Sequence, residues 1–156
     1  MRLSTKGRYA VMAMADLAKR GGGEHAVTLA EIARRQNISL PYLEQLFARL
    51  RRRGLVKSVR GPGGGYRLAH LAGETAVGEI IDAVDEPLKA VRCNAVGVGC
   101  MPGGERCLTH DLWDDLGRHI EDYLSSVTLE DVVSGRLARD RVRGPAGAEQ
   151  GASAAA

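Results

Sequence analysis

The sequence predicts a mainly α-helical protein with a small β wing: a winged helix-turn-helix domain followed by a long dimerisation helix. Three observations lead to this fold class. Two short helical patterns are joined by a tight turn, a glycine-rich hairpin follows the second, and one long apolar stripe lies nearer the C-terminus. The 156 residues suit one compact domain or a small domain with an extension.

The first two helices are predicted from apolar spacing and from helix-capping residues. Residues 5–20 form a helical pattern that three glycines at 21–23 end. Thr28 and Glu31 have the spacing of a capping box at the start of a helix over 29–36. In the first helix the residues on neighbouring turns are Tyr9, Met12, Ala13, Asp16 and Leu17.

A third helix over 40–53 follows a short turn, is capped by Ser39 and ends at Gly54. Pro41 falls in its first turn, where a missing N–H costs little. Its apolar stripe consists of Leu43, Leu46, Phe47 and Leu50. Because this helix is rich in arginine and follows a short helix, the pair has the pattern of a helix-turn-helix.

Two alternating segments, 55–60 and 66–70, then predict the strands of a wing. GPGGG at 61–65 forms the hairpin tip between them, and Arg60 and Arg67 flank it. Glycine lets a backbone approach a phosphate or a minor groove closely, and arginine suits a narrow groove. The wing is therefore expected to contact DNA.

The C-terminal half begins with a short helix over 77–86, which Thr75 is expected to cap. A long helix over 110–127 begins at Thr109 and has one apolar stripe over roughly five turns. The stripe consists of Leu112, Leu116, Ile120, Tyr123 and Val127, and is widened by Trp113 and Leu124. A single long stripe attached to a small domain is typical of a helix that pairs with a second subunit.

We expect three parts: a winged helix-turn-helix DNA-binding domain over 1–72, a cluster-binding loop and dimerisation helix over 73–138, and a disordered tail over 139–156. Within the second part, Thr128 caps a last short helix over 129–137. Charge divides along the first boundary. Residues 1–72 have a net charge of +10 and the remainder −7, so a polyanion is the expected partner of the first part alone.

The function classes of membrane protein and enzyme are not supported by the sequence. No apolar run approaches the ~20 residues of a membrane span, and the N-terminal segment lacks the features of a signal peptide, so a cytoplasmic location is expected. There is no nucleotide-binding loop, no Ser-His-Asp set and no carboxylate pair in a plausible pocket. We therefore expect no enzyme activity.

Sequence-specific binding of a double-stranded DNA operator is the function that the first part predicts, with the helix 40–53 in the major groove. Glutamine pairs with adenine, and glutamate accepts from cytosine N4. The predicted DNA-binding residues are Arg2, Lys6, Ser39, Tyr42, Glu44, Gln45, Arg60, Gly63 and Gly64.

All three cysteines and one histidine lie in a glycine-rich stretch with the spacing Cys93-x6-Cys100-x6-Cys107-x2-His110. These four side chains are candidate metal ligands. A zinc site usually opens with two cysteines two to four residues apart, whereas six is a loose spacing. An iron–sulfur cluster accepts wider loops and accepts histidine in place of a thiolate. Zinc, a cluster and thiol redox sensing without metal are the three alternatives that spacing leaves open.

Four stretches resemble the IscR branch, the bacterial iron–sulfur cluster regulators, of a wider family of winged-helix repressors. They are MRLSTKGRYAV, ISLPYLEQLFARLRRRGLVKSVRGPGGGYRL, VGEIIDAVDEP and CLTHDLWDDL. The resemblance implies a homodimer with one 2Fe–2S cluster per subunit, bound by Cys93, Cys100, Cys107 and His110. It also implies control of cluster-assembly genes by cluster occupancy, with a cluster-assembly scaffold as the expected donor. DNA contacts by Tyr42, Glu44, Gln45 and Arg60 are implied as well.

The chain departs from this branch at two places: its cysteine gaps are one residue longer, and Pro41 replaces a small hydroxyl residue. A nitric-oxide-sensing relative is the alternative within the family. That branch uses an acidic ligand near the N-terminus, where this chain has Arg8, and His110 also argues against it.

Overall fold

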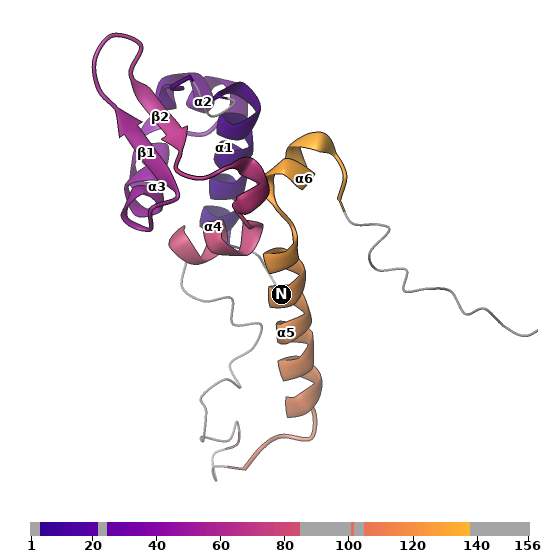
Figure 1. Cartoon of the computed structure of the whole chain (residues 1–156). Coiled ribbons are helices and arrows are strands. Elements are labelled where there is room, and N and C mark those ends of the chain that lie inside the picture. Colours follow the sequence, from indigo (N-terminus) through magenta and orange to yellow (C-terminus); the bar gives the residue numbers. More distant parts are fainter. Residues whose placement is uncertain (1–3, 22–24, 85–100, 102–104, 138–156) are drawn as a thin grey trace, which may run out of the picture.

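The computed structural model describes residues 4–21, 25–84, 101 and 105–137. Arg2, Cys93, Cys100 and the predicted tail over 139–156 lie outside these ranges. Within them the order is α1 (Thr5–Gly21), α2 (Leu29–Gln36), α3 (Leu40–Arg52), β1 (Val56–Val59), β2 (Gly65–Leu68), the 3₁₀ turn η1 (Ala72–Glu74), α4 (Val77–Val84), α5 (His110–Ser126) and α6 (Leu129–Ser134). The predicted fold class is confirmed: a mainly helical protein with a small two-stranded wing (Figure 1).

The hydrophobic core lies where α1, α3 and α4 meet. The predicted stripe of α3 is the one the structure buries, and Phe47 at its centre is fully buried. The Phe47 ring meets the Tyr66 ring of β2 edge-on, with centroids 5.0 Å apart. This contact joins the third helix to the wing, so the two predicted DNA-contacting elements share one core.

The predicted capping box of α2 is present. The Thr28 hydroxyl accepts from the Glu31 backbone N–H, and the Glu31 carboxylate accepts from the Thr28 N–H. These hydrogen bonds from Thr28 lower the pKa of Glu31 below its ordinary value. The carboxylate therefore stays ionised at neutral pH, next to the positive end of the helix.

Of two other predicted caps, Ser39 is confirmed in position only and Thr75 is wrong. Ser39 is at the start of α3 but its side chain makes no capping hydrogen bond, because Pro41 removes one of the N–H groups that a cap uses. Thr75 is buried, and its hydroxyl donates to the Leu71 carbonyl at 3.1 Å. Glu79 instead accepts from the Ala76 N–H at the start of α4.

The wing pairs β1 with β2 antiparallel, from Val56 opposite Leu68 to Val59 opposite Gly65. The strands are each shorter than predicted, and β2 begins one residue earlier, at Gly65. Just beyond the paired residues, the Ala69 N–H still donates to the Leu55 carbonyl at 3.0 Å. On its other edge β2 exchanges two hydrogen bonds with Val27, which ties the wing to the connection before α2. A Cβ on Gly65 would lie 2.5 Å from the Val27 carbonyl oxygen, so only glycine fits there.

α4 occupies the junction of the molecule and packs on α1, α3 and α5. Ile81 lies against Gly7 of α1, and a Cβ on Gly78 would lie 3.0 Å from the Ser125 hydroxyl of α5. α5 then runs away from the winged-helix unit as a rod, while α6 returns to pack on α1 (Figure 1). The compact unit thus contains elements from both sides of the predicted boundary at residue 72. Among the described residues, no helix is long and apolar enough to cross a membrane.

Candidate functional site

The first half of α3 gathers most of the predicted base-contacting residues on one exposed face. Glu44 and Gln45 are exposed on the side opposite the buried stripe, and Ser39 is exposed directly before the helix. Tyr42 is half-buried, with its ring edge-on to Tyr9 of α1 at a centroid distance of 5.9 Å. The helix therefore presents a hydroxyl, a carboxylate and an amide, which are the groups that read base edges.

The wing tip divides its glycines between two tasks. Gly63 has a φ of 72° and open space where a Cβ would lie, so another backbone can approach it. At Gly64 a Cβ would lie 2.6 Å from the Val59 carbonyl oxygen, so the wing itself requires glycine there. Arg60 is exposed immediately before the tip. Lys6, the remaining described residue of the predicted set, is exposed in the first turn of α1.

One wing cation, Lys57, was missed in the sequence, whereas Arg67 was already noted beside the hairpin tip. Lys57 of β1 lies directly opposite Arg67 of β2, and like charges opposite each other destabilise a strand pair. Within the described part of the chain, the buried Nε of Arg67 has no hydrogen-bond partner. The strand alternation carried the signal, since residues two apart on a hairpin face the same side. The pair is suited to a polyanion, which would offset its repulsion.

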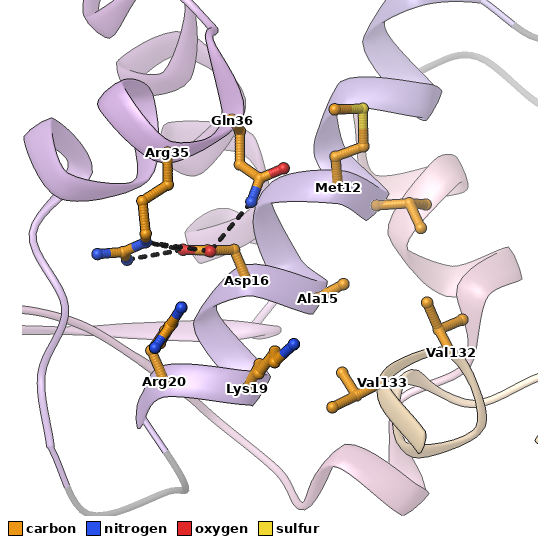
Figure 2. A pocket seen from close by; sticks show the side chains of 10 residues that line it. Met12, Ala15, Asp16, Lys19, Arg20, Arg35, Gln36, Val132 and Val133 are labelled. Carbon is orange, nitrogen blue, oxygen red and sulfur yellow. Dashed lines mark hydrogen bonds and ion pairs between the residues drawn. The ribbon is translucent and has the colours of Figure 1, made fainter. Parts of the chain in front are cut away.

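A buried ion pair fixes α2 against α1. Asp16 is 7% exposed, and its carboxylate accepts from Arg35 at 2.7 and 3.1 Å and from the Gln36 amide at 3.0 Å. Figure 2 shows both side chains reaching from α2 to Asp16 at the edge of an open groove of about 580 Å³. The hydrogen bonds that Arg35 donates to Asp16 raise the pKa of the Arg35 guanidinium. Because Asp16 is satisfied by these partners, we assign it to holding α2 of the helix-turn-helix against α1.

The predicted metal ligands are only partly within the described residues. Cys93 and Cys100 lie outside them, whereas Cys107 and His110 share one turn at the start of α5, where the His110 backbone N–H donates to the Cys107 carbonyl at 3.0 Å. Both side chains are half-buried. The described residues contain no group of three potential ligands, as expected when two cysteines are outside them.

Hydroxyl and indole groups surround this turn. The Thr109 Oγ1 lies 3.7 Å from the Cys107 Sγ, and it accepts from the Trp113 indole N–H at 3.2 Å. In the sequence, Thr109 indicates only a helix start and Trp113 only part of an apolar stripe. The i, i+4 spacing of the two on a helix was the signal available for their contact.

A side-chain hydrogen bond joins α3 to the end of α4. Arg49 donates from Nη1 to the Val84 carbonyl at 2.8 Å. Val84 is the last described residue of α4, so this bond ties α3 to that end of the helix. The sequence segment that contains Cys93 begins directly after this point.

The whole length of the winged-helix unit and of α5 has counterparts among known proteins. A model of the Rrf2 family, described as iron-dependent transcriptional regulators, matches residues 3–135. The chain belongs to the Rrf2 family. It is a transcriptional regulator, and the relatives are named as regulators rather than enzymes, in agreement with the sequence-based expectation.

Several Rrf2 relatives are similar over most of their length. The HTH-type transcriptional regulator IscR of Pectobacterium carotovorum is 56% identical over 140 residues, which cover 90% of this chain and 84% of that protein. IscR of Photorhabdus laumondii is 53% identical and covers 96% of this chain and 94% of its own. The predicted resemblance to IscR is confirmed.

Solved Rrf2 structures agree with the fold. T. potens IscR superposes with a TM-score of 0.71 at 39% identity and covers 94% of both chains. CymR, the global cysteine regulator of B. subtilis, superposes with a TM-score of 0.74 at 37% identity over 86% of this chain and 98% of its own.

Proposed function

We propose that this Rrf2 protein is an iron–sulfur cluster-sensing, sequence-specific DNA-binding regulator of cluster-assembly genes. The observation that carries the proposal is the position of Cys107 and His110 in one turn at the start of α5. α5 packs on α4, and α4 packs on the helix that presents Glu44 and Gln45. A change at the ligands therefore has a short physical path to the DNA-reading face.

The ligand set fits one 2Fe–2S cluster per subunit, held by Cys93, Cys100, Cys107 and His110. Thiolate and imidazole are the ligands that such clusters accept, and the positive end of α5 favours an anionic group beside it. When bound, the cluster supplies a redox-active centre that oxidants release. A cluster-assembly scaffold is the expected donor, and the protein is expected to work in the cytoplasm.

Contacts between α3, α4 and α5 would transmit cluster binding to the DNA-reading helix. Residues 85–109 join the end of α4 to the start of α5, so ligation would restrain both ends together. Arg49 holds α3 to Val84, where this segment starts. The segment's state therefore acts on the pose of α3 through one hydrogen bond and the α3–α4 packing.

A homodimer completes the proposal. α5 exposes an apolar face formed by Leu112, Trp113, Leu116 and Tyr123, with exposed fractions between 38% and 61%. Paired α5 helices would bury this face and set two winged-helix units at a fixed spacing on a two-fold symmetric operator. On each unit we expect Lys57 and Arg67 to bind phosphate beside the predicted contacts of Arg60 and Gly63.

Anaerobic purification tests the cofactor directly. The expected product is a coloured protein with iron and acid-labile sulfide in equal amounts, matching one 2Fe–2S cluster per subunit. Cys107→Ala and His110→Ala should each reduce cluster retention, whereas the control His119→Ala, an exposed histidine on the same helix, should retain it. A colourless parent protein that carries zinc would instead support a cluster-free regulator.

A further inference from the structure

We propose that the Thr109 hydroxyl donates a hydrogen bond to the Cys107 sulfur, is oriented for this by Trp113, and so raises the reduction potential of the bound cluster. The inference rests on the proposed function, because it concerns a ligand of that same site. It assigns Thr109 and Trp113 as positioning residues, neither of them a ligand.

The direction of the hydrogen bonds follows from the chemistry of the three groups. An indole N–H is only a donor, so the 3.2 Å contact from Trp113 makes Thr109 Oγ1 the acceptor. The hydroxyl proton of Thr109 is then left to point elsewhere. A metal-bound thiolate is an acceptor, and the Cys107 sulfur lies 3.7 Å from the same oxygen, within reach of a hydrogen bond to sulfur.

Thr109 also forgoes the usual role of its position. Threonine directly before a helix normally accepts a hydrogen bond from the N–H of the second or third helical residue. Thr109 makes no such bond, and its φ of −103° and ψ of 10° differ from the extended backbone of Thr128, which does cap α6. The hydroxyl is thus committed to Cys107 and Trp113 in place of the helix end.

A donor to a ligand sulfur stabilises the more negative form of a cluster. One-electron reduction adds negative charge to the cluster and its thiolates, and a hydrogen bond to sulfur disperses part of that charge. Removal of the Thr109 hydroxyl should therefore shift the midpoint potential to a more negative value. Trp113 contributes by holding the oxygen, so its effect should have the same sign and a smaller size.

Three variants of the full chain test the inference by anaerobic redox titration after reconstitution with iron and sulfide. Thr109→Val keeps the shape and removes the hydroxyl, Thr109→Ser keeps the hydroxyl, and Trp113→Phe keeps a ring without the N–H. The expected order of midpoint potentials is parent equal to T109S, then W113F, then T109V as the most negative. If T109V retains no cluster, the comparison of W113F with the parent decides.

Tryptophan fluorescence supplies a readout that does not need the cluster. Trp113 is the only tryptophan in the chain, so the emission of the apo-protein reports this turn. T109V should shift that emission and T109S should leave it unchanged.

The outcomes separate the inference from the proposed function. A parent protein that takes up no cluster overturns both. A parent that takes up a cluster, with T109V at the same midpoint potential, overturns the inference and leaves the proposed function standing. The inference also falls if T109S differs from the parent as much as T109V does.

Discussion

The winged-helix unit and α5 both contain a helix with an apolar stripe, but the stripe is buried in the first and exposed in the second. α3 has 13 residues and buries Leu43, Leu46, Phe47 and Leu50 of its apolar stripe. α5 has 17 residues with a comparable stripe and buries none of them. An apolar stripe thus predicts a helix face that needs a partner, while only the fold decides whether that partner is in the same chain. For α5 we infer that it is a second copy.

Charge separates the two regions in the same way. Most of the exposed cations among the described residues lie on the winged-helix unit, including Arg51–Arg53 at and just after the end of α3, whereas α5 carries five acidic residues and one arginine. An acidic rod is repelled by DNA. The two regions are therefore suited to different partners, a nucleic acid for one and a protein for the other.

The largest expected effect comes from disrupting the buried core of the winged-helix unit. Phe47→Ala removes a fully buried ring and should lower the free energy of unfolding by about 3–5 kcal/mol. The exposed control on α5, Glu121→Ala, should change it by no more than about 0.5 kcal/mol. Urea unfolding followed by circular dichroism measures both. A loss below 1 kcal/mol for F47A, on the order of a surface substitution, would place the core elsewhere.

Disrupting the exposed apolar face of α5 should change the oligomeric state and leave the fold of each subunit intact. The double variant Leu112→Asp with Leu116→Asp puts two charges in the proposed α5 interface. It should weaken association by about 2–4 kcal/mol, since central apolar contacts dominate an interface. Sedimentation equilibrium measures the change, and the helical circular dichroism signal should persist. A variant that dimerises as well as the parent argues for a different interface.

The same substitution, aspartate to asparagine, compares a buried ion pair of the winged-helix unit with an exposed ion pair of α5. Asp16→Asn removes the buried charge that Arg35 contacts between α1 and α2, and should lower the free energy of unfolding by about 1.5–3 kcal/mol. Asp115→Asn removes an exposed partner of Arg118 on α5 and should cost at most about 0.5 kcal/mol. Thermal unfolding of both variants at the same protein concentration checks the difference, and equal costs would contradict it.

A smaller effect on stability than that of Asp16→Asn is expected where α3 meets the end of α4. Arg49→Gln removes the bond to the Val84 carbonyl and should cost about 0.5–1.5 kcal/mol. Its effect on regulation should be larger, because DNA affinity would respond less to cluster occupancy. Arg52→Gln is the matched control on the same helix, since Arg52 bonds only to its own helix at Ala48 among the contacts described. The proposed path is wrong if R49Q and R52Q respond alike.

Much of the fold was predictable because its signals are local. The Thr28–Glu31 capping box, the glycine tip and the α3 stripe each lie within a few residues, and the structure contains each of them. The missed contacts are not local. Asp16 meets Arg35 and Gln36 across 19 and 20 residues, and Arg49 meets Val84 across 35, distances at which spacing carries no signal.

The candidate site was predictable in its residue types and less so in its surroundings. The cysteine spacing and His110 indicated a metal centre, but spacing did not assign any role to Thr109 or Trp113 beyond helix formation. The error at Thr75 has the same origin, since a hydroxyl takes whichever partner the fold brings closest, here the Leu71 carbonyl.

DNA affinity measured for the cluster-loaded and cluster-free forms of the same protein tests the central claim most directly. The DNA is a site selected from a random pool by the loaded form, and the measurement is repeated at several salt concentrations. The account predicts that the DNA affinity differs between the two forms. It also predicts that the affinity of each form falls as the salt concentration rises, because about 0.9 of a counterion is released for each phosphate that the protein neutralises. Equal affinity of both forms for every selected site would contradict it.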